Sequence, residues 1–283
     1  MENDVFQKEV ELKRLKLQGE LFYEFEQPIY QRIIDGRRNL RLLDIGCNNG
    51  QKTFNRFNSE SFSHIIGLDY LENIAQQAQQ QYGNEVFSFH VCDVAAPNFI
   101  QRLQKIMEDR GIEAFDVIHM SCLLMHLKDP GTVLNALKYV LAPNGKLIMI
   151  EPDDTDSGFE PDEEGLYPKF VETLSKDPYA GNRFLASALP EMLEKSGYTN
   201  IKLEHSGICA EKTQQERKQA IFGIFCSYLP EDILLLRKQE PDNPIYLACE
   251  EWVRMHFEVL REKMLRKDTS IYMGVKVYTC GVE

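Results

Sequence analysis

The sequence predicts an α/β protein built around a doubly wound, mainly parallel β-sheet. Five short apolar segments alternate with helical segments between residues 41 and 151. This order builds a parallel sheet that is covered by helices on both faces. Acidic residues and glycines gather where the apolar segments end, and the carboxyl ends of the strands are where such sheets bind ligands.

The elements of this sheet follow from local patterns. Short apolar runs bounded by turn residues predict strands, and apolar residues spaced by three or four predict helices. The predicted strands are Arg41–Gly46, Ile65–Asp69, Val86–Val91, Phe115–Ser121 and Lys146–Glu151. The predicted helices between them are 51–59, Glu72–Gln81, Phe99–Asp109 and Pro130–Leu141.

Different patterns flank this region. Apolar residues at helical spacing in 5–35 predict one or two helices, interrupted near Pro28. Residues 151–164 hold eight acids and no basic residue, which predicts a loop. The later predicted elements are helices at Tyr167–Leu174 and Arg183–Ser196, a strand at Asn200–Ser206, a helical stretch over 211–266 and a final strand at Ile271–Val282.

Charge and composition disfavour several classes of protein. The 283 residues are 43% hydrophobic and 27% charged, as in a soluble globular protein. Acids outnumber bases by 44 to 32, and the resulting net charge of −12 repels a phosphate backbone, so we expect no nucleic-acid partner. We expect no membrane partner, because no apolar stretch approaches the length of about 20 residues that spans a bilayer. The polar N-terminus lacks the pattern of a signal peptide, which predicts a cytoplasmic protein.

The seven cysteines predict neither a disulfide framework nor a zinc site. Their number is odd, they are scattered from position 47 to position 280, and no Cys-x-x-Cys pair occurs. Free buried thiols are the favoured interpretation. We therefore expect no metal site.

The most informative segment is Leu42–Gly50, an apolar run that ends in Asp44 and continues into a turn with two glycines. A second apolar run ends at Asp69, 25 residues after the first acid. Glycines at a strand end let the backbone and a helix N-terminus approach a ligand. An acid at the end of the next strand can accept both hydroxyls of a ribose. The pair predicts an adenosine-containing cofactor.

Two phosphate-binding alternatives fit this turn poorly. The dinucleotide fingerprint Gly-x-Gly-x-x-Gly is incomplete, since Asn48 stands where the middle glycine is required. No Gly-Lys-Ser/Thr sequence occurs, which argues against a P-loop. S-Adenosylmethionine (SAM) carries no phosphate and needs less room, so it suits the turn better.

Five segments in this order and spacing resemble those of the class I, Rossmann-like SAM-dependent methyltransferases. Within that class the chain is most similar to small-molecule methyltransferases such as those of quinone biosynthesis. The segments are Leu42–Gly50, Gly67–Asp69, Cys92–Val94, Phe115–Pro130 and Leu141–Leu147. The resemblance implies a seven-stranded sheet whose last strand is antiparallel. It also implies SAM as cofactor and S-adenosylhomocysteine as product.

The resemblance further implies a domain organisation. Residues 1–36 form an N-terminal helical lid, and 37–206 together with 271–283 form the SAM-binding domain. Residues 207–270 form a helical insertion before the final strand, which serves as a substrate cap or as a dimer surface. Monomer and homodimer both stay open.

Carried over position by position, the resemblance assigns the cofactor site. Asp44 and the backbone of Gly46–Gly50, including Cys47 and Asn48, hold the methionine end of SAM, and Asp69 accepts the ribose hydroxyls. The remaining contacts are Tyr70 packed on the adenine, Asp93 accepting from the adenine amino group, the Val94 N–H facing a ring nitrogen, and Met120 and Ser121 lining the methionyl side.

Methyl transfer from a sulfonium is an in-line displacement, to which a protein contributes mainly alignment and desolvation. A hydroxyl acceptor usually needs a general base as well. The candidates are His126 after the fourth strand, Glu151 at the end of the fifth strand, and Asp153 in the loop that follows. A capping or packing imidazole and solvated loop acids would explain the same residues without catalysis.

The substrate is open between two hypotheses. The acids of 151–164 would attract a cationic or amine-bearing substrate, whereas Arg183 would anchor a carboxylate. Aromatic residues of the flanking helices, among them Tyr23 and Tyr167, would line a pocket for a hydrophobic or planar substrate.

The sequence therefore predicts a SAM-dependent methyltransferase that acts on O, N or C of a small molecule. A SAM-binding, non-catalytic regulatory protein, with the insertion as an interaction surface, is the alternative from another class. An RNA or protein methyltransferase is a third possibility, and the acidic charge counts against RNA.

Overall fold

The computed structural model describes residues 9–57 and 60–282. The chain forms two compact units, each of which is described by itself. We call the first the sheet unit; it comprises Tyr23–Glu151, Leu185–His205 and the residues from Lys276 onward. We call the second the helical unit; it comprises the residues up to Phe22, Pro152–Phe184 and Ser206–Val275.

The bounds of these units differ from those of the predicted domains. Residues 152–184 belong to the helical unit together with the predicted insertion, because a short strand among them pairs with residues 270–272. The N-terminal helix α1 (Glu9–Ile34) is continuous through Pro28; its residues up to Phe22 belong to the helical unit, and those from Tyr23 onward belong to the sheet unit. The part of the predicted lid before residue 9 lies outside the described residues.

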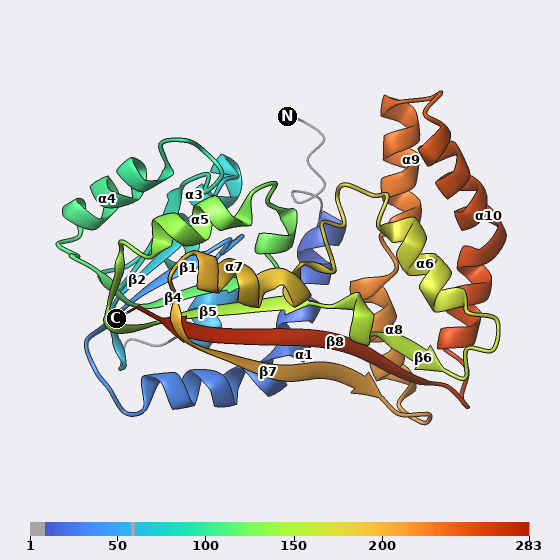
Figure 1. The fold of residues 1–283 in the computed structure, drawn as a ribbon, viewed down its shortest axis with the longest axis horizontal. Coiled ribbons are helices and arrows are strands. Elements are labelled where there is room, and N and C mark those ends of the chain that lie inside the picture. The colour runs from blue at the N-terminus through green and yellow to red at the C-terminus, as the bar shows by residue number, and fades with distance from the viewer. Residues whose placement is uncertain (1–8, 58–59, 283) are drawn as a thin grey trace. The chain divides into compact units, whose positions relative to one another are not determined.

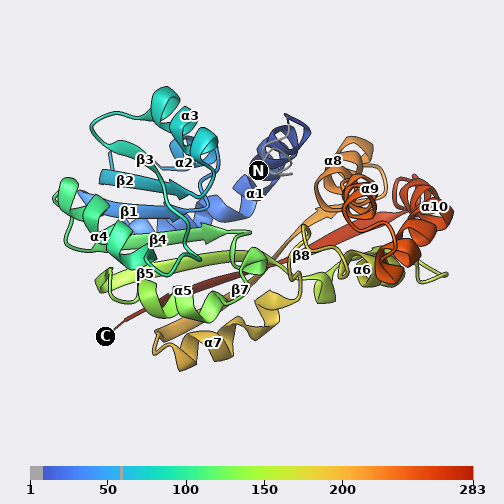
Figure 2. The same ribbon diagram turned by 90° about the horizontal axis from the view of Figure 1, so that it is seen from above.

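Eight strands of the described chain form one sheet in the order β3-β2-β1-β4-β5-β8-β6, and β7 pairs with β8 (Figures 1 and 2). The pairs β1–β2, β2–β3, β1–β4 and β4–β5 are parallel, whereas β6 and β8 are antiparallel. The doubly wound, mainly parallel fold is therefore confirmed. The strands are β1 (Leu40–Ile45), β2 (Phe62–Asp69), β3 (Phe87–Val91), β4 (Phe115–Ser121), β5 (Leu141–Pro152), β6 (Gly158–Glu160), β7 (Thr199–Ala210) and β8 (Ser270–Gly281).

The short strand β6 corrects two predictions. The sheet has eight strands and not seven, and the segment 151–164 contains a strand and is not entirely a loop. Phe159 is buried and pairs with Ile271 in the antiparallel register of β6 and β8. One apolar residue among many acids gives no strand pattern in the sequence, and the pairing is supplied by a strand more than 100 residues further along the chain.

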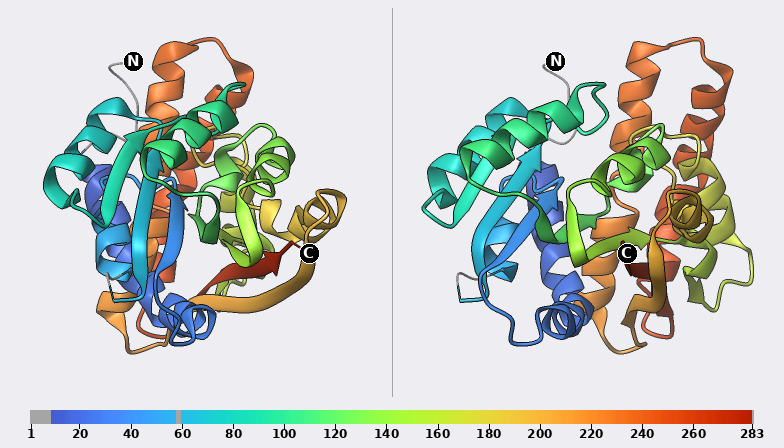
Figure 3. Two further views of the ribbon diagram at one scale, coloured as in Figure 1. Left: turned by 90° about the vertical axis from the view of Figure 1, so that its left-hand side faces the viewer. Right: turned by 60° about the vertical axis from the view of Figure 1, so that its left-hand side comes forward.

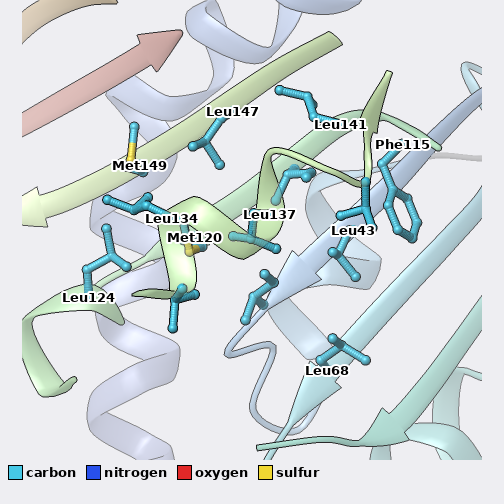
Figure 4. Packing of buried hydrophobic residues seen from close by; sticks show 14 of the residues in the cluster. Leu43, Leu68, Phe115, Met120, Leu124, Leu134, Leu137, Leu141, Leu147 and Met149 are labelled. Atoms are coloured by element: carbon cyan, nitrogen blue, oxygen red, sulfur yellow. The ribbon is translucent and has the colours of Figure 1, made fainter. Parts of the chain in front are cut away.

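The strands of the sheet unit present two different faces, because neighbouring side chains point in opposite directions. Leu43 and Ile45 of β1, with Met120 of β4, belong to the main apolar core, which also contains residues of α4, α5 and α7. Figure 4 shows how the leucines and methionines of this core interdigitate. Asp44 and His119 alternate with these residues and therefore point to the opposite face. The helices of this unit are the end of α1, α2 (Gln51–Arg56), α3 (Glu72–Tyr82), α4 (Phe99–Asp109), α5 (Pro130–Leu137) and α7 (Leu189–Lys195), with short turns η2 (Leu124–His126) and η4 (Leu185–Ala188).

The helical unit is dominated by four helices after β5. α9 and α10 lie side by side, as the orange and red helices of Figures 1 and 3 show. The buried Lys218 of α8 donates to the carbonyls of Lys212 and Thr269 at 2.9 and 3.1 Å, which ties α8 to the segment before β8. The helices are α6 (Leu166–Leu174), α8 (Gln215–Phe225), α9 (Leu229–Gln239) and α10 (Pro244–Met264), with the short turn η3 (Asp154–Asp156).

One stretch departs from the expectation that no segment is long and apolar enough to cross a membrane. Gln215–Gln239, 25 residues long, meets that criterion by length and composition alone. The structure divides it into α8 and α9, with Pro230 in the first turn of α9, and half of its most apolar window is buried inside the protein. A core helix of a soluble protein meets the same criterion.

Candidate functional site

The glycine turn, residues 46–50, joins the end of β1 to the start of α2. Its backbone is left-handed at Gly46, Asn48 and Gly50, with φ angles of 76°, 48° and 73°. Glycine adopts this conformation without strain, and asparagine is more common there than most other residues. Asn48 therefore keeps the turn tight, although it replaces a glycine of the dinucleotide motif. The Gly46 N–H donates to the Leu68 carbonyl at 2.8 Å, which fixes the turn to β2.

An aromatic ring packs directly behind the glycine turn. A Cβ added at Gly50 would lie 2.7 Å from the Phe89 ring, and one at Gly67 would lie 2.5 Å from the same ring and 2.9 Å from the Cys47 sulfur. Side chains in a close-packed interior do not approach so closely, so both positions require glycine. The Cys47 side chain is buried, and its place in this packing is that of a small filler behind the turn.

Asp69 ends β2 beside the glycine turn. Its Oδ2 accepts a hydrogen bond from the Asn48 N–H at 2.9 Å, and its Oδ1 accepts one from the Leu71 N–H at 3.0 Å. A carboxylate can accept about four hydrogen bonds, so these two donors orient Asp69 without by themselves exhausting its capacity. The two strand ends that the sequence paired are therefore in direct contact.

Asp44 lies on the buried side of the turn. Its Oδ2 accepts from the Thr53 hydroxyl at 2.5 Å, and its Oδ1 lies 2.7 Å from His119 Nδ1. The other ring nitrogen, His119 Nε2, lies 2.9 Å from the Tyr30 hydroxyl. Burial raises the pKa of Tyr30 well above its ordinary value, so this hydroxyl stays protonated. We predicted that Asp44 holds the methionine end of the cofactor; in the structure its carboxylate joins β1 to side chains of α2 and β4, and His119 continues the chain of contacts to Tyr30 of α1.

A buried cluster of charges beside α2 was not identified from the sequence. Glu26 of α1 is completely buried, and its carboxylate accepts from Lys52 Nζ at 2.6 Å and from Arg56 Nε at 3.0 Å. Lys52 Nζ also donates to Ser121 Oγ, at 2.9 Å. Burial alone would raise the pKa of the Glu26 carboxyl, but neighbouring positive charges, above all Lys52, hold it below its ordinary value. The available sequence signal was the i, i+4 spacing of the two bases, which places them on one face of α2.

The other predicted cofactor residues follow β2, β3 and β4. Tyr70, which directly follows Asp69, is 49% exposed. The Asp93 carboxylate is exposed and accepts from the Ala95 N–H at 2.8 Å, which closes a turn around Val94. Met120 is completely buried, with its side chain in the main apolar core.

Glu151, at the end of β5, is the candidate base with the most unusual environment. Its side chain is completely buried, and its Oε1 accepts from the N–H groups of Leu123 and Leu124 at 3.1 and 2.8 Å. Its Oε2 has no hydrogen-bond partner among the described residues. Desolvation raises the pKa of this carboxyl from 4.5 to about 7, although the backbone N–H groups of Leu124, Leu123 and Met125 oppose the rise. A carboxyl group with this pKa can take up a proton near neutral pH.

The other two candidate bases are placed differently. His126 ends the turn η2 and is exposed. Asp153 belongs to the helical unit, and its Oδ1 accepts from both the N–H and the hydroxyl of Thr155, at 2.9 and 2.5 Å. Its carboxylate therefore caps η3, as an aspartate at the start of a helix often does.

Two of the three predicted substrate residues meet in the helical unit. Arg183 is buried, and its Nη2 donates to Asp154 Oδ1 at 2.6 Å. The Tyr167 hydroxyl lies 3.4 Å from the same oxygen. The Arg183 guanidinium is thus already paired with an acid of its own chain, which weakens the prediction that it anchors a substrate carboxylate. The third residue, Tyr23, lies in the sheet unit, where the Arg56 guanidinium stacks 4.5 Å from the centre of its ring.

Comparison with known protein families identifies the family to which the chain belongs. A family model described as a methyltransferase domain matches residues 37–221, which is more than half of the chain. The chain belongs to the methyltransferase domain family. The matched region contains the glycine turn and the ends of β2, β3, β4 and β5. The predicted class I SAM-dependent methyltransferase, with SAM as its cofactor, is confirmed at the level of the family.

Curated relatives of this methyltransferase have different acceptors in their names. The tRNA U34 carboxymethyltransferase of Hahella chejuensis is 25% identical over 203 residues, which cover 68% of this chain and 55% of the relative. The ubiquinone biosynthesis O-methyltransferase of Pasteurella multocida is 24% identical over 116 residues, which cover 41% of this chain and 47% of the relative. The chain thus spans about half the length of these relatives.

Solved structures share the fold of this methyltransferase at low identity. Phosphoethanolamine N-methyltransferase 2 of Haemonchus contortus, in complex with SAM, has a TM-score of 0.53 at 14% identity, over 98% of this chain and 59% of that one. The Bacillus subtilis protein YcgJ has a TM-score of 0.52 at 15% identity, over 87% of this chain and 94% of that one. At these identities the likeness concerns the fold, which agrees with the sheet order described above.

Proposed function

We propose that this protein transfers a methyl group from SAM to an oxygen, nitrogen or carbon atom of a small molecule. The observation that carries the proposal is the hydrogen bond between Asp69 and the glycine turn. It places an acid that can accept ribose hydroxyls beside a tight strand-to-helix turn, which is the arrangement that an adenosine ligand needs. Bound SAM supplies a methyl group that is activated by its sulfonium.

The residues around the turn suit SAM better than a dinucleotide. The N–H groups of Cys47 and Gly50 donate to backbone carbonyls, and that of Asn48 donates to Asp69, so the turn has few donors left for a pyrophosphate. SAM has no phosphate and does not need them. The residues that would hold it are Asp69 at the ribose, Tyr70 and Asp93 with Val94 at the adenine, and the glycine turn with Ser121 at the methionyl end.

Within this proposal, Glu151 accepts the proton that a hydroxyl or amine loses when it is methylated. Its Oε2 has no hydrogen-bond partner within residues 9–57 and 60–282, and its pKa of about 7 lets it exchange a proton at neutral pH. Its Oε1 holds the backbone of Leu123, whose side chain would lie 3.2 Å from a Cβ at Gly46. Glu151 is therefore separated from the glycine turn by a single residue.

The acceptor class rests on charge. A protein with a net charge of −12 is repelled by the phosphates of RNA, and one relative is by its name an O-methyltransferase of ubiquinone biosynthesis. Another relative is by its name a tRNA carboxymethyltransferase. RNA is therefore the acceptor that an experiment must separate from small molecules.

The test uses SAM that carries a labelled methyl group. The protein is offered a panel of amines and matched alcohols, a fractionated small-molecule extract, and bulk tRNA in parallel reactions. We expect label in the small-molecule fractions, and Glu151→Gln is expected to lower the rate for alcohols more than for amines. Label in tRNA alone would contradict the proposed acceptor. Binding of S-adenosylhomocysteine without transfer to any acceptor would favour the non-catalytic alternative.

A further inference from the structure

We propose that Lys52 is the cation that recognises the amino-acid carboxylate of the cofactor, and that Glu26 of α1 is the buried counter-ion that holds Lys52 in position. The inference rests on the proposed function, because it assumes that SAM or S-adenosylhomocysteine binds at the glycine turn. It assigns a role in cofactor recognition to two residues outside the predicted site.

The backbone N–H groups of the glycine turn are not available to the carboxylate of a bound cofactor. The N–H groups of residues 46–51 all donate within the chain. Their acceptors are the Leu68 carbonyl for Gly46 and Cys47, the Asp69 carboxylate for Asn48, the Asn48 side chain for Asn49, the Cys47 carbonyl for Gly50 and the Asn49 side chain for Gln51. A carboxylate bound beside this turn therefore needs a side-chain donor, and a charged donor gives the stronger hydrogen bond.

Lys52 is the basic side chain that the structure places at this edge. It follows the turn by two residues, and its Nζ reaches Ser121 Oγ at 2.9 Å. Ser121 ends β4, the strand that pairs with β1 just before the turn begins. The Lys52 side chain is 27% exposed, whereas that of Arg56 is 9% exposed and lies over the Tyr23 ring. Of the two bases, Lys52 is the one that a ligand can reach.

Glu26 explains how Lys52 is held. An ammonium on a four-carbon chain is flexible and loses rotamer entropy when it is fixed, and the completely buried Glu26 carboxylate fixes it at 2.6 Å. Arg56 binds the second oxygen of Glu26 at 3.0 Å. The Glu26 carboxylate thus fixes the ammonium of Lys52 through one oxygen, while Arg56 occupies the other. The other buried acid nearby, Asp44, is bonded to Thr53 and His119.

The test compares two ligands that differ only in the carboxylate. S-Adenosyl-3-thiopropylamine is S-adenosylhomocysteine without its carboxylate, and calorimetry gives the Kd of each for the wild type, Lys52→Met and Arg56→Met. The last variant is a matched control, because it removes the other base bound to Glu26. We expect the wild type and Arg56→Met to favour S-adenosylhomocysteine by about 10- to 100-fold, the range of one charge-assisted hydrogen bond. Lys52→Met is expected to bind the two ligands about equally.

The other possible outcomes contradict either the role of Lys52 or the proposed function. An unchanged ratio in Lys52→Met overturns the inference, and so does an equal loss of the ratio in Arg56→Met, since the effect would then belong to the cluster as a whole. If Lys52→Met does not fold, Lys52→Gln replaces it, with the same expectation. A wild type that binds neither SAM nor S-adenosylhomocysteine contradicts the proposed function itself, whereas a wild type that binds both ligands equally contradicts only the role of Lys52.

Discussion

The Asp69 carboxylate accepts a hydrogen bond from the backbone N–H of Asn48 at 2.9 Å, across 21 residues of sequence. This bond joins the end of β2 to the turn that follows β1. The backbone at Asn48 is left-handed, with a φ angle of 48°. The acid and the turn therefore act as one structural unit.

The first prediction concerns the backbone at Asn48. Asn48→Gly and Asn48→Val both keep the N–H that Asp69 binds, and both lose the side-chain oxygen that accepts from Asn49. They differ in how easily they adopt a φ of 48°. We expect the valine variant to be less stable than the glycine variant by about 1 to 2 kcal/mol, measured by urea unfolding. Equal stabilities would show that the turn does not depend on this conformation.

The second prediction concerns the packing behind the turn. Gly67→Ala places a methyl group 2.5 Å from the Phe89 ring, which we expect to destabilise the protein by about 1 to 3 kcal/mol through overpacking. Gly67 has an ordinary backbone conformation, so the loss comes from space alone. Phe89→Leu in the same chain should recover part of it, and a double-mutant cycle in urea measures the recovery. Additive losses would contradict the close contact.

The third prediction concerns Glu151 and pH. Its pKa is raised from 4.5 to about 7 in the folded protein, so between these values the folded state holds a proton that the unfolded chain releases. Stability must therefore fall as pH rises through this window, by about 3 kcal/mol from this group. Glu151→Gln removes this titration. The free energy of unfolding of the variant, relative to that of the wild type, should therefore rise by this amount between pH 4.5 and about pH 8. A difference that stays constant with pH would rule out the raised pKa.

The fourth prediction concerns Glu26. Its pKa is lowered in the folded protein, so its ionised form stabilises the fold above the ordinary value of 4.5, and this contribution is lost as pH falls below that value. Glu26→Gln leaves Lys52 and Arg56 without their carboxylate, and we expect a loss of about 2 to 3 kcal/mol at neutral pH. Glu20→Gln on the exposed side of the same helix is the control. Equal unfolding curves for Glu26→Gln and Glu20→Gln would contradict the importance of the cluster.

Much of the fold could be predicted because its signals are local. The observed bounds of α4 and β4 agree with the prediction residue for residue, since apolar periodicity and flanking turn residues mark both ends. The strand β6 could not be predicted, because three residues among acids acquire their conformation only by pairing with β8. The division of α1 between two units depends in the same way on contacts far along the chain.

The candidate site shows the same division between local and distant signals. Parallel strands end at one edge of the sheet, so the sequence could bring Asp69 and the glycine turn together without knowledge of the structure. The bond between Glu26 and Lys52 joins residues 26 positions apart on two different helices, and it depends on how each helix is rotated. The role of Asp153 as a cap of η3 depends on the exact path of the chain after β5.

The central claim is that an adenosine cofactor binds where Asp69 meets the glycine turn. Its most direct test is calorimetric titration of S-adenosylhomocysteine into the wild type, Asp69→Ala and Asp109→Ala. Asp109 is the control, because it is an exposed aspartate of α4 that pairs with the exposed Lys105. The account predicts binding to the wild type and to Asp109→Ala with the same Kd, and binding to Asp69→Ala that is weaker by about 100-fold, as expected for two charge-assisted hydrogen bonds. Equal affinity of Asp69→Ala and the wild type, or no binding to the wild type, would contradict it.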